Sequence, residues 1–185
     1  RDGEVVAWSL TGLALLAAHK DAVAGPCAAA ISVCGERVTG MLGHGVRPEV
    51  AKLLPGQNID QSTWSYGHAL LFLAELQMRR PSSETARAVQ EAADHLARIQ
   101  TSDGGWCHSA SHDPNPLGYT TFNAVGNIAI AGLGAARRAG ASVDPKVFER
   151  ALRYLADSAN AAGGIGYSPR PGQRGCGEAG RSGGT

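Results

Sequence analysis

Residues 95–106 read HLARIQTSDGGW, and residues 154–165 read YLADSANAAGGI. The two stretches align without a gap at an offset of 59 residues, and the same offset relates Gly67 to Gly126. A repeat of this length is typical of proteins built from stacked supersecondary units, since each unit is too small to bury its apolar face alone. The offset therefore predicts a repeat architecture.

Residues 82–100 show the pattern of an amphipathic helix. Apolar residues recur at i, i+3, i+4 and i+7, namely Val89, Ala92, Ala93 and Leu96. The same stripe is predicted 59 residues later, at Phe148, Ala151, Leu152 and Leu155. This second helix should begin at Asp144, a good N-cap, followed by Pro145 at the first helical position.

Two other segments, 69–74 and 128–133, are apolar on all sides, which indicates helices surrounded by protein. Residues 11–16 resemble residues 66–71 at an offset of 55, which indicates an earlier copy, with a partner helix expected at 27–41. No strand-like alternation is present. The sequence thus predicts an all-α chain of helix pairs, in one domain over 1–185, with repeats at about 1–45, 63–106 and 121–165.

Composition excludes some classes of partner. The chain has 17 Lys and Arg against 16 Asp and Glu, without a run of like charges, so no nucleic acid is expected as a partner. The longest apolar run, Ala69 to Ala74, is far shorter than the roughly 20 residues that span a bilayer, so no transmembrane segment is expected. By the repeat register, Thr185 falls where another helix should begin, which predicts a longer protein. The compartment stays open.

The four cysteines are widely spaced. Buried or free thiols are the simplest interpretation. A disulfide between Cys27 and Cys34, or between Cys107 and Cys176, stays open because connectivity cannot be read from sequence.

A buried helix alternating with an outer helix that is followed by Gln100, Gly104 and Trp106 resembles the repeat of squalene and oxidosqualene cyclases and of protein prenyltransferase β subunits. In the next copy, the corresponding positions of Gln and Trp hold Ala159 and Ile165. The resemblance implies an α/α toroid, here an incomplete barrel of helix pairs of about 55–59 residues. It also implies that Gln bridges one outer helix to the next and that Trp stacks in the joint.

The catalytic motifs of these families are not found. The chain contains neither the DxDD motif of hopene-type cyclases nor a DDxxD motif for diphosphate. Where prenyltransferases hold zinc through Asp-x-Cys, the nearest match is Asp60-Gln61-Ser62, and a hydroxyl is a poor zinc ligand.

Two further motifs are weighed for chemistry. The loop after Trp106 carries metal-binding side chains at Cys107, His108, His112 and Asp113, so a zinc site is an alternative to ordinary polar loop residues. Residues 175–179, GCGEA, resemble the thioester motif of complement-type domains, but Ala179 replaces the Gln that the thioester needs. We predict no cofactor.

Aromatic and polar residues cluster where inner helices should begin. They are Trp64, Tyr66, His68, Tyr119 and Asn123. Rings at such positions hold an apolar chain or a cation, or else they pack between helices. We take these five residues as the candidate ligand-binding site.

The sequence favours a non-catalytic repeat module that binds a lipid-like or peptide ligand, or a partner protein. The alternative is an enzyme of the prenyltransferase or terpene-cyclase kind with its catalytic residues outside this chain. An open arc of repeats would also leave two apolar ends, which predicts self-association through them.

Overall fold

A computed structural model describes residues 2–19, 21, 24–43, 61–108, 121–160 and 164–166. These residues form six α-helices: α1 (Asp2–Ala18), α2 (Ala28–Gly43), α3 (Ser62–Arg79), α4 (Ser83–Arg98), α5 (Asn123–Arg138) and α6 (Pro145–Asp157). No β-strand occurs in the described ranges, and one isolated β-bridge joins Ala159 to Ile165. The prediction of an all-α fold is confirmed.

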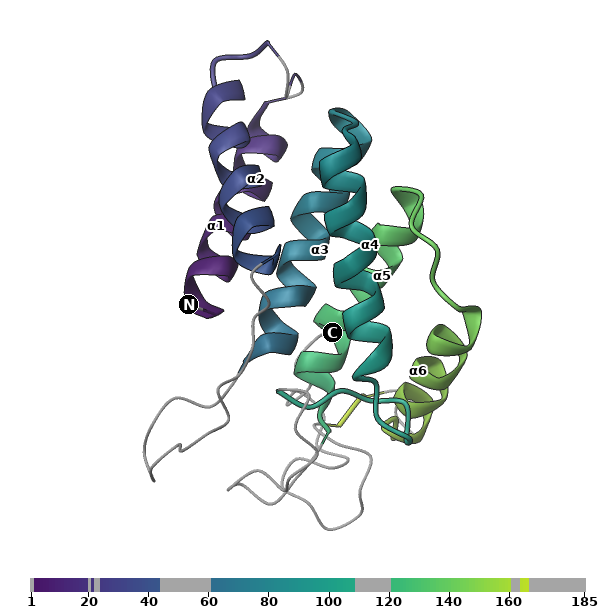
Figure 1. The fold of residues 1–185 in the computed structure, drawn as a ribbon. Helices are drawn as coiled ribbons and strands as arrows, with labels where there is room; N and C mark the ends of the chain where they lie inside the picture. The colour runs from purple at the N-terminus through teal and green to yellow at the C-terminus, as the bar shows by residue number, and fades with distance from the viewer. Residues whose placement is uncertain are drawn as a thin grey trace, which may run out of the picture.

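The helices follow one another as antiparallel pairs (Figure 1). Helices α1, α3 and α5 run in the same direction and form an inner row, in which α3 packs against both α1 and α5. Helices α2 and α4 pack against the outside of this row, and α6 makes a lighter contact with α5. The alternation of inner and outer helices is as predicted, while closure into a toroid stays a prediction.

The helix pairs lie close to the predicted repeats 1–45, 63–106 and 121–165, with α3 beginning one residue earlier, at Ser62. The exact limits of these repeats, and the single domain over 1–185, stay predictions. Residues 44–60, between α2 and α3, lie outside the described residues.

The inner helices approach closely where glycine replaces a side chain. A Cβ added to Gly67 on α3 would lie 2.4 Å from Cγ2 of Ile128 on α5, and one added to Gly132 would lie 2.8 Å from the Gly67 carbonyl oxygen. On the other side of α3, Phe72 fills the space over Gly12 of α1. Dispersion contacts weaken steeply with distance, so this close approach is what lets the row pack.

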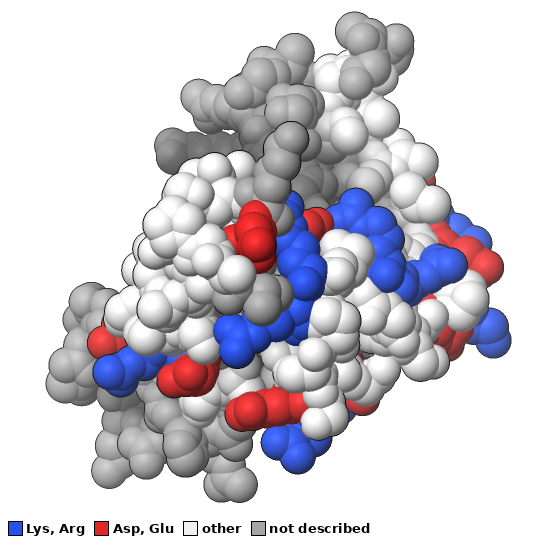
Figure 2. Space-filling model, turned by 90° about the horizontal axis from the view of Figure 1, so that it is seen from above, with Lys and Arg blue, Asp and Glu red and all other residues white. Residues whose placement is uncertain are grey.

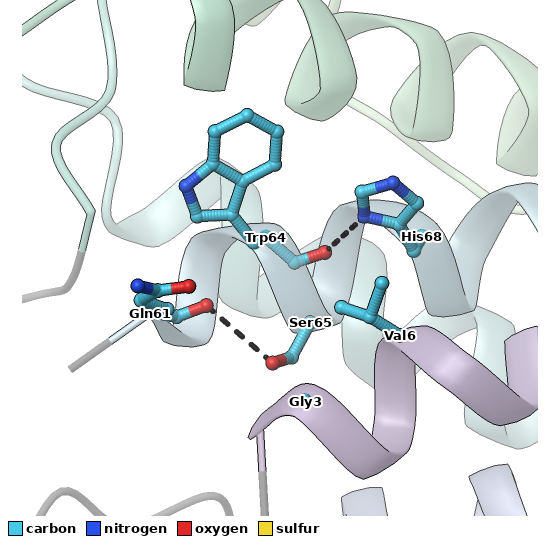
Figure 3. Close-up of a pocket in the computed structure, with 6 residues that line it drawn as sticks. All are labelled: Gly3, Val6, Gln61, Trp64, Ser65 and His68. Atoms are coloured by element: carbon cyan, nitrogen blue, oxygen red, sulfur yellow. Dashed lines mark hydrogen bonds between the residues drawn. The ribbon is translucent and has the colours of Figure 1, made fainter. Parts of the chain in front are cut away.

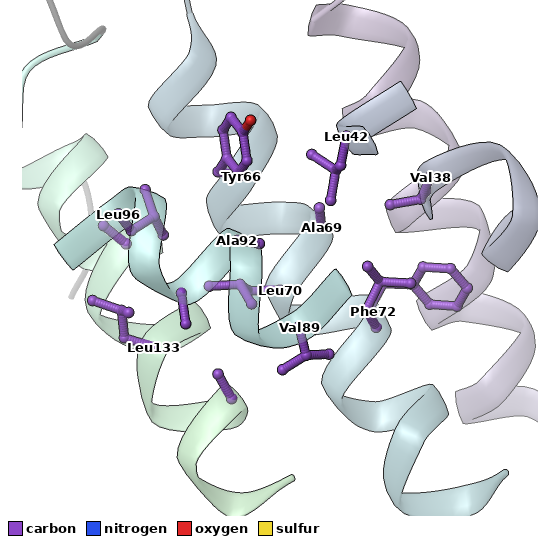
Figure 4. Close-up of a cluster of buried hydrophobic side chains, with 14 of the residues drawn as sticks. Val38, Leu42, Tyr66, Ala69, Leu70, Phe72, Val89, Ala92, Leu96 and Leu133 are labelled. Atoms are coloured by element: carbon purple, nitrogen blue, oxygen red, sulfur yellow. The ribbon is translucent and has the colours of Figure 1, made fainter. Parts of the chain in front are cut away.

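The core lies between α3 and its neighbours (Figure 4). Leu70 and Phe72 of α3, Val89 and Leu96 of α4, and Leu133 of α5 are buried there. The stripe predicted for the helix at 82–100 is therefore confirmed.

The stripe predicted for the helix at 144–157 is only partly correct. Ala151 is buried, but Leu152 is 62% exposed, and the other buried positions are Val147 and Tyr154. Helix α6 is rotated about its axis relative to the predicted stripe. Its inner face packs against the joint of Gln100 and Trp106, which is described below. Its start is as predicted, since the Asp144 carboxylate accepts a hydrogen bond from the Lys146 amide at 2.9 Å.

The two segments predicted to be buried on all sides, 69–74 and 128–133, differ from each other in how far they are buried. In α3, Ala69, Leu70, Phe72, Leu73 and Ala74 are buried. In α5, Ala131 is exposed, and Ile128 and Ile130 are only half-buried. Helix α5 has an inner helix on one side only within the described residues, so its far side meets solvent.

The joint between α4 and α6 is built as the resemblance implies. The Gln100 side-chain amide donates to the Gly104 and Val147 carbonyls, both at 2.9 Å, and its oxygen accepts from Nε of Arg150 at 2.9 Å. Trp106 is fully buried beside it and donates its indole N–H to the Leu96 carbonyl at 2.9 Å. Gly104 has φ +93°, and a Cβ there would lie 2.3 Å from the Arg150 carbonyl oxygen.

The carboxyl ends of α3 and α5 carry arginines. Arg79 of α3 donates to the Leu16 carbonyl of α1, and Arg138 of α5 pairs with Glu75 of α3 at 3.0 Å. Figure 2, which views the molecule from above, shows basic and acidic side chains side by side on this face. Cation placement at helix carboxyl ends is favourable because the helix dipole is negative there.

Two other predictions concern the whole chain. None of the helices in the described ranges has the length and apolar character needed to cross a bilayer. Cys27 and Cys34 are free thiols, so the disulfide between them is not formed. Cys176 lies outside the described residues, so its pairing with Cys107 is untested. Burial raises the pKa of the Cys34 thiol.

Candidate functional site

A pocket of about 360 Å³ lies between α1 and α3, near the amino ends of both helices (Figure 3). Its lining residues are Gly3, Val6, Gln61, Trp64, Ser65 and His68. The four from α3 and its N-cap recur at i, i+3, i+4 and i+7, which places them on one face of the helix. Gly3 adds no side chain on the α1 side, and this leaves the space open.

Trp64 forms one wall of the pocket. Its ring stacks against His68, with ring centroids 6.0 Å apart and an angle of 22° between the ring planes. Its indole N–H donates to Nδ1 of His108 at 3.1 Å, so the polar end of the ring is satisfied away from the pocket. The apolar part of the indole is left to face a ligand.

His68 forms a second wall with a defined tautomer. Nδ1 of His68 lies 2.8 Å from the Trp64 carbonyl oxygen. Because a carbonyl oxygen only accepts, Nδ1 must carry the proton, and the neutral ring keeps its lone pair on Nε2. His68 can therefore accept a hydrogen bond from a ligand.

The remaining polar groups of the pocket are neutral. The Ser65 hydroxyl donates to the Gln61 carbonyl at 3.4 Å, as a helix-start residue often does. None of the six lining residues is Asp, Glu, Lys or Cys. The lining thus suits an uncharged, mostly apolar group with one polar atom.

Two of the five predicted site residues, Trp64 and His68, line this pocket. Tyr66 does not, because it lies two residues from Trp64 on the opposite face of α3, where it stacks on His95 of α4 at a centroid distance of 3.9 Å. Asn123 does not either: it is fully buried and donates to the Gly166 carbonyl. Tyr119 lies outside the described residues. Tyr66 and Asn123 therefore lie away from this pocket, and a ligand-binding role for the five residues stays a prediction.

The partner of Tyr66, His95, has a perturbed pKa. Burial, and next the positive charge of Arg98, lower the pKa of His95 to about 4. Arg98 donates to Nδ1 of His95 at 3.2 Å, which is compatible only with an unprotonated Nδ1. His95 is therefore a neutral ring at the α3–α4 contact.

Sequence reasoning missed Gly3, Val6, Gln61 and Ser65. Helical spacing could have identified Gln61 and Ser65 once Trp64 and His68 were chosen, since all four share one face. Gly3 and Val6 belong to another helix, and only the packing of α1 on α3 brings them there.

The predicted metal-binding residues are only partly described. The His108 ring accepts from Trp64 through Nδ1 and packs against Phe122 at a centroid distance of 4.5 Å, and burial lowers its pKa. His112 and Asp113 lie outside the described residues, as do Asp60 and the segment 175–179. Within the described part of the chain, no group of three or more His, Cys, Asp or Glu is placed to hold a metal ion. A zinc site therefore stays an untested alternative.

Comparison with known proteins places the chain in a family. A family model described as "Domain of unknown function (DUF6288)" matches residues 6–185. The chain belongs to this family. A curated relative, "Drimenyl diphosphate synthase" of Streptomyces showdoensis, is 40% identical over 90 residues, which are 49% of this chain and 15% of that protein. The chain thus matches a small part of that relative's length, and no solved structure matches it. Over these 90 residues the chain is similar to a terpene synthase, and its fold is all-helical.

Proposed function

We propose that this DUF6288 chain is a non-catalytic repeat module of a terpenoid-cyclase-like protein, and that its inner helices bind a lipid-like ligand. One observation carries the proposal: a pocket at the amino ends of α1 and α3, walled by the Trp64 indole, with no ionisable acid, thiol or amine among its lining residues. Ligand pockets are typically concave and apolar with few polar groups.

The lining favours an isoprenoid-like chain with a hydroxyl. The Trp64 ring and the Val6 methyls offer apolar surface, while Nε2 of His68 accepts one hydrogen bond. The volume of about 360 Å³ falls within the range of small-molecule pockets. In a toroid of such repeats, this pocket would form part of the wall of the central cavity.

A second candidate is an enzyme of the terpene-cyclase kind. The match to a drimenyl diphosphate synthase supports it. In that case this chain supplies cavity wall, and the reacting acid or metal ligands come from other parts of the protein. A peptide or a partner protein is a further occupant of the same surface.

Calorimetric titration with farnesol in detergent-free buffer tests the first proposal. We expect wild-type protein to bind, and Trp64→Ala to bind about tenfold more weakly, which corresponds to about 1.4 kcal/mol. Leu152→Ala is the matched control, because Leu152 is 62% exposed on α6, away from the pocket. Absence of binding, or equal binding by Trp64→Ala, would overturn the proposal.

Farnesyl diphosphate distinguishes the second candidate. Incubation with Mg²⁺ followed by mass spectrometry of the organic extract should return the unchanged substrate if the module is non-catalytic. A cyclised product that disappears in Trp64→Ala would favour the enzyme instead.

A further inference from the structure

We infer that His108, which lies 44 residues along the chain from Trp64, is a positioning residue that holds the Trp64 indole as the wall of the pocket. The inference rests on the proposed function, because it says what sets the shape of that same site. His108 itself is not among the residues that line the pocket.

Residue 108 accepts two hydrogen bonds from the start of α3. The Trp64 indole N–H donates to Nδ1 of His108 at 3.1 Å, and the Thr63 amide donates to the His108 carbonyl at 3.0 Å. Thr63 and Trp64 lie in the first turn of α3, where backbone amides have no partner within the helix. His108 therefore completes the helix start and orients the tryptophan at once.

A residue of the next predicted repeat packs against the His108 ring. Its ring contacts Phe122, whose centroid lies 4.5 Å away and which is 2% exposed. The Phe122 amide donates to the Trp106 carbonyl at 3.3 Å, so this contact is anchored to the buried Trp106 of the α4–α6 joint. A chain of contacts thus runs from the joint, through His108, to the wall of the pocket.

The bond also defines the tautomer. An indole N–H only donates, so Nδ1 of His108 must be unprotonated and the neutral ring carries its proton on Nε2. The indole N–H of Trp64 is part-buried. Without an acceptor at this position, the N–H would turn towards water and carry the ring out of its stack with His68.

Two substitutions separate the hydrogen bond from the bulk of the side chain. His108→Leu removes the acceptor, whereas His108→Asn keeps one, because the Asn Oδ1 is the same number of bonds from the backbone as the His Nδ1. The readout is the indole ¹⁵N–¹H NMR signal of Trp64, assigned with Trp64→Phe. The Trp106 signal is the internal reference, since its N–H is bound to the Leu96 carbonyl.

We expect His108→Leu to shift the Trp64 signal and to raise its solvent exchange rate about tenfold, with the Trp106 signal unchanged. His108→Asn should restore the Trp64 signal. Farnesol affinity should fall about three- to tenfold in the Leu variant and recover in the Asn variant. A Trp64 signal that is the same in wild type and His108→Leu would overturn the inference.

A double-variant cycle covers the case in which His108→Leu disturbs the loop itself. If the two residues act through the hydrogen bond, adding His108→Leu to Trp64→Phe should cost little further affinity, because Phe has no N–H. Full additivity of the two losses would contradict the inference. If the NMR results hold but wild type binds no farnesol, the positioning role stands and the proposed ligand fails.

Discussion

Trp106 is the largest fully buried side chain in the described residues, and its indole N–H donates to the Leu96 carbonyl of α4. We expect Trp106→Ala to lower the free energy of unfolding by about 3–5 kcal/mol, through lost apolar burial and the cavity that remains. Urea denaturation followed by circular dichroism measures it. Trp106→Phe keeps most of the volume and loses the bond to Leu96, so it should cost less. Similar costs for the two variants would contradict the cavity argument.

His95 makes stability depend on pH. Its pKa is about 4 in the folded protein against the usual 6.5 of histidine, so the unfolded chain binds a proton more readily. The contribution to stability is therefore complete above pH 6.5 and is lost as the pH falls towards 4. Because the His95 ring is partly solvated, we expect the free energy of unfolding to fall by about 1–2 kcal/mol, which is less than the pKa shift alone would give.

Urea denaturation at several pH values between 4 and 7 checks this expectation. His95→Phe keeps a ring against Tyr66 and cannot titrate, so its stability should fall less on acidification. His108 has a pKa lowered in the same direction, and a smaller slope should therefore remain in the variant. A variant with the same slope as wild type would show that His95 is not the source.

At the scale of the helix, the α3–α5 contact depends on how closely two backbones approach. Gly132→Ala would place a Cβ 2.8 Å from the Gly67 carbonyl oxygen, and we expect a loss of about 1–3 kcal/mol as the helices move apart. Gly134→Ala on the same helix meets nothing within 4 Å. It should stabilise by up to about 1 kcal/mol through helix propensity. Thermal unfolding of both variants tests the pair, and equal effects would refute the close-packing account.

The α4–α6 connection depends on glutamine side chains. Gln100→Ala removes the hydrogen bonds to Val147 and Arg150, so we expect a cost of about 1–3 kcal/mol and faster hydrogen exchange in α6 than in α4. Gln90 also bridges α4 to the segment before α6, through both the Ser142 amide and carbonyl, but it is exposed there. Gln90→Ala should therefore cost less. An unchanged rate of hydrogen exchange in α6 of Gln100→Ala would contradict the role of Gln100 in joining α4 to α6.

At the scale of the whole molecule, stability should be graded across the row of helices. Helix α3 packs against α1, α4 and α5, whereas α6 has a light contact with α5. Local opening follows the density of buried contacts, so amides in the middle of α3 should exchange slowest and those of α6 fastest. Hydrogen exchange with mass spectrometry measures this order. Uniform protection would indicate a single cooperative unit.

Much of the fold could be predicted from local patterns. Ser82 and Asp144 accept amide hydrogen bonds at the starts of α4 and α6, as their side chains favour, and the α4 stripe is buried as its spacing implies. These features depend on residues within a few positions of one another. The stripe of α6 and the burial of α5 were predicted less well, because they depend on which neighbours each helix has.

In the candidate site, too, some features follow from local patterns and others depend on distant parts of the chain. Trp64 and His68 were identified by residue type and by their place at the start of an inner helix, and helical spacing alone separates them from Tyr66. The pairing of Trp64 with His108 could not be predicted, because 44 residues separate them and no local pattern links a loop to a distant helix start.

The sequence by itself determined the all-α class and the alternation of inner and outer helices, because both depend on periodicity. The Gln100 and Trp106 joint was implied by the resemblance to the cyclase and prenyltransferase repeat, which a short motif carries. Only the tertiary structure decided which face of α3 opens to a pocket, that Gly3 and Val6 of α1 complete it, and that His108 fixes the indole. The physical reason is that such contacts come from how helices distant in sequence pack together.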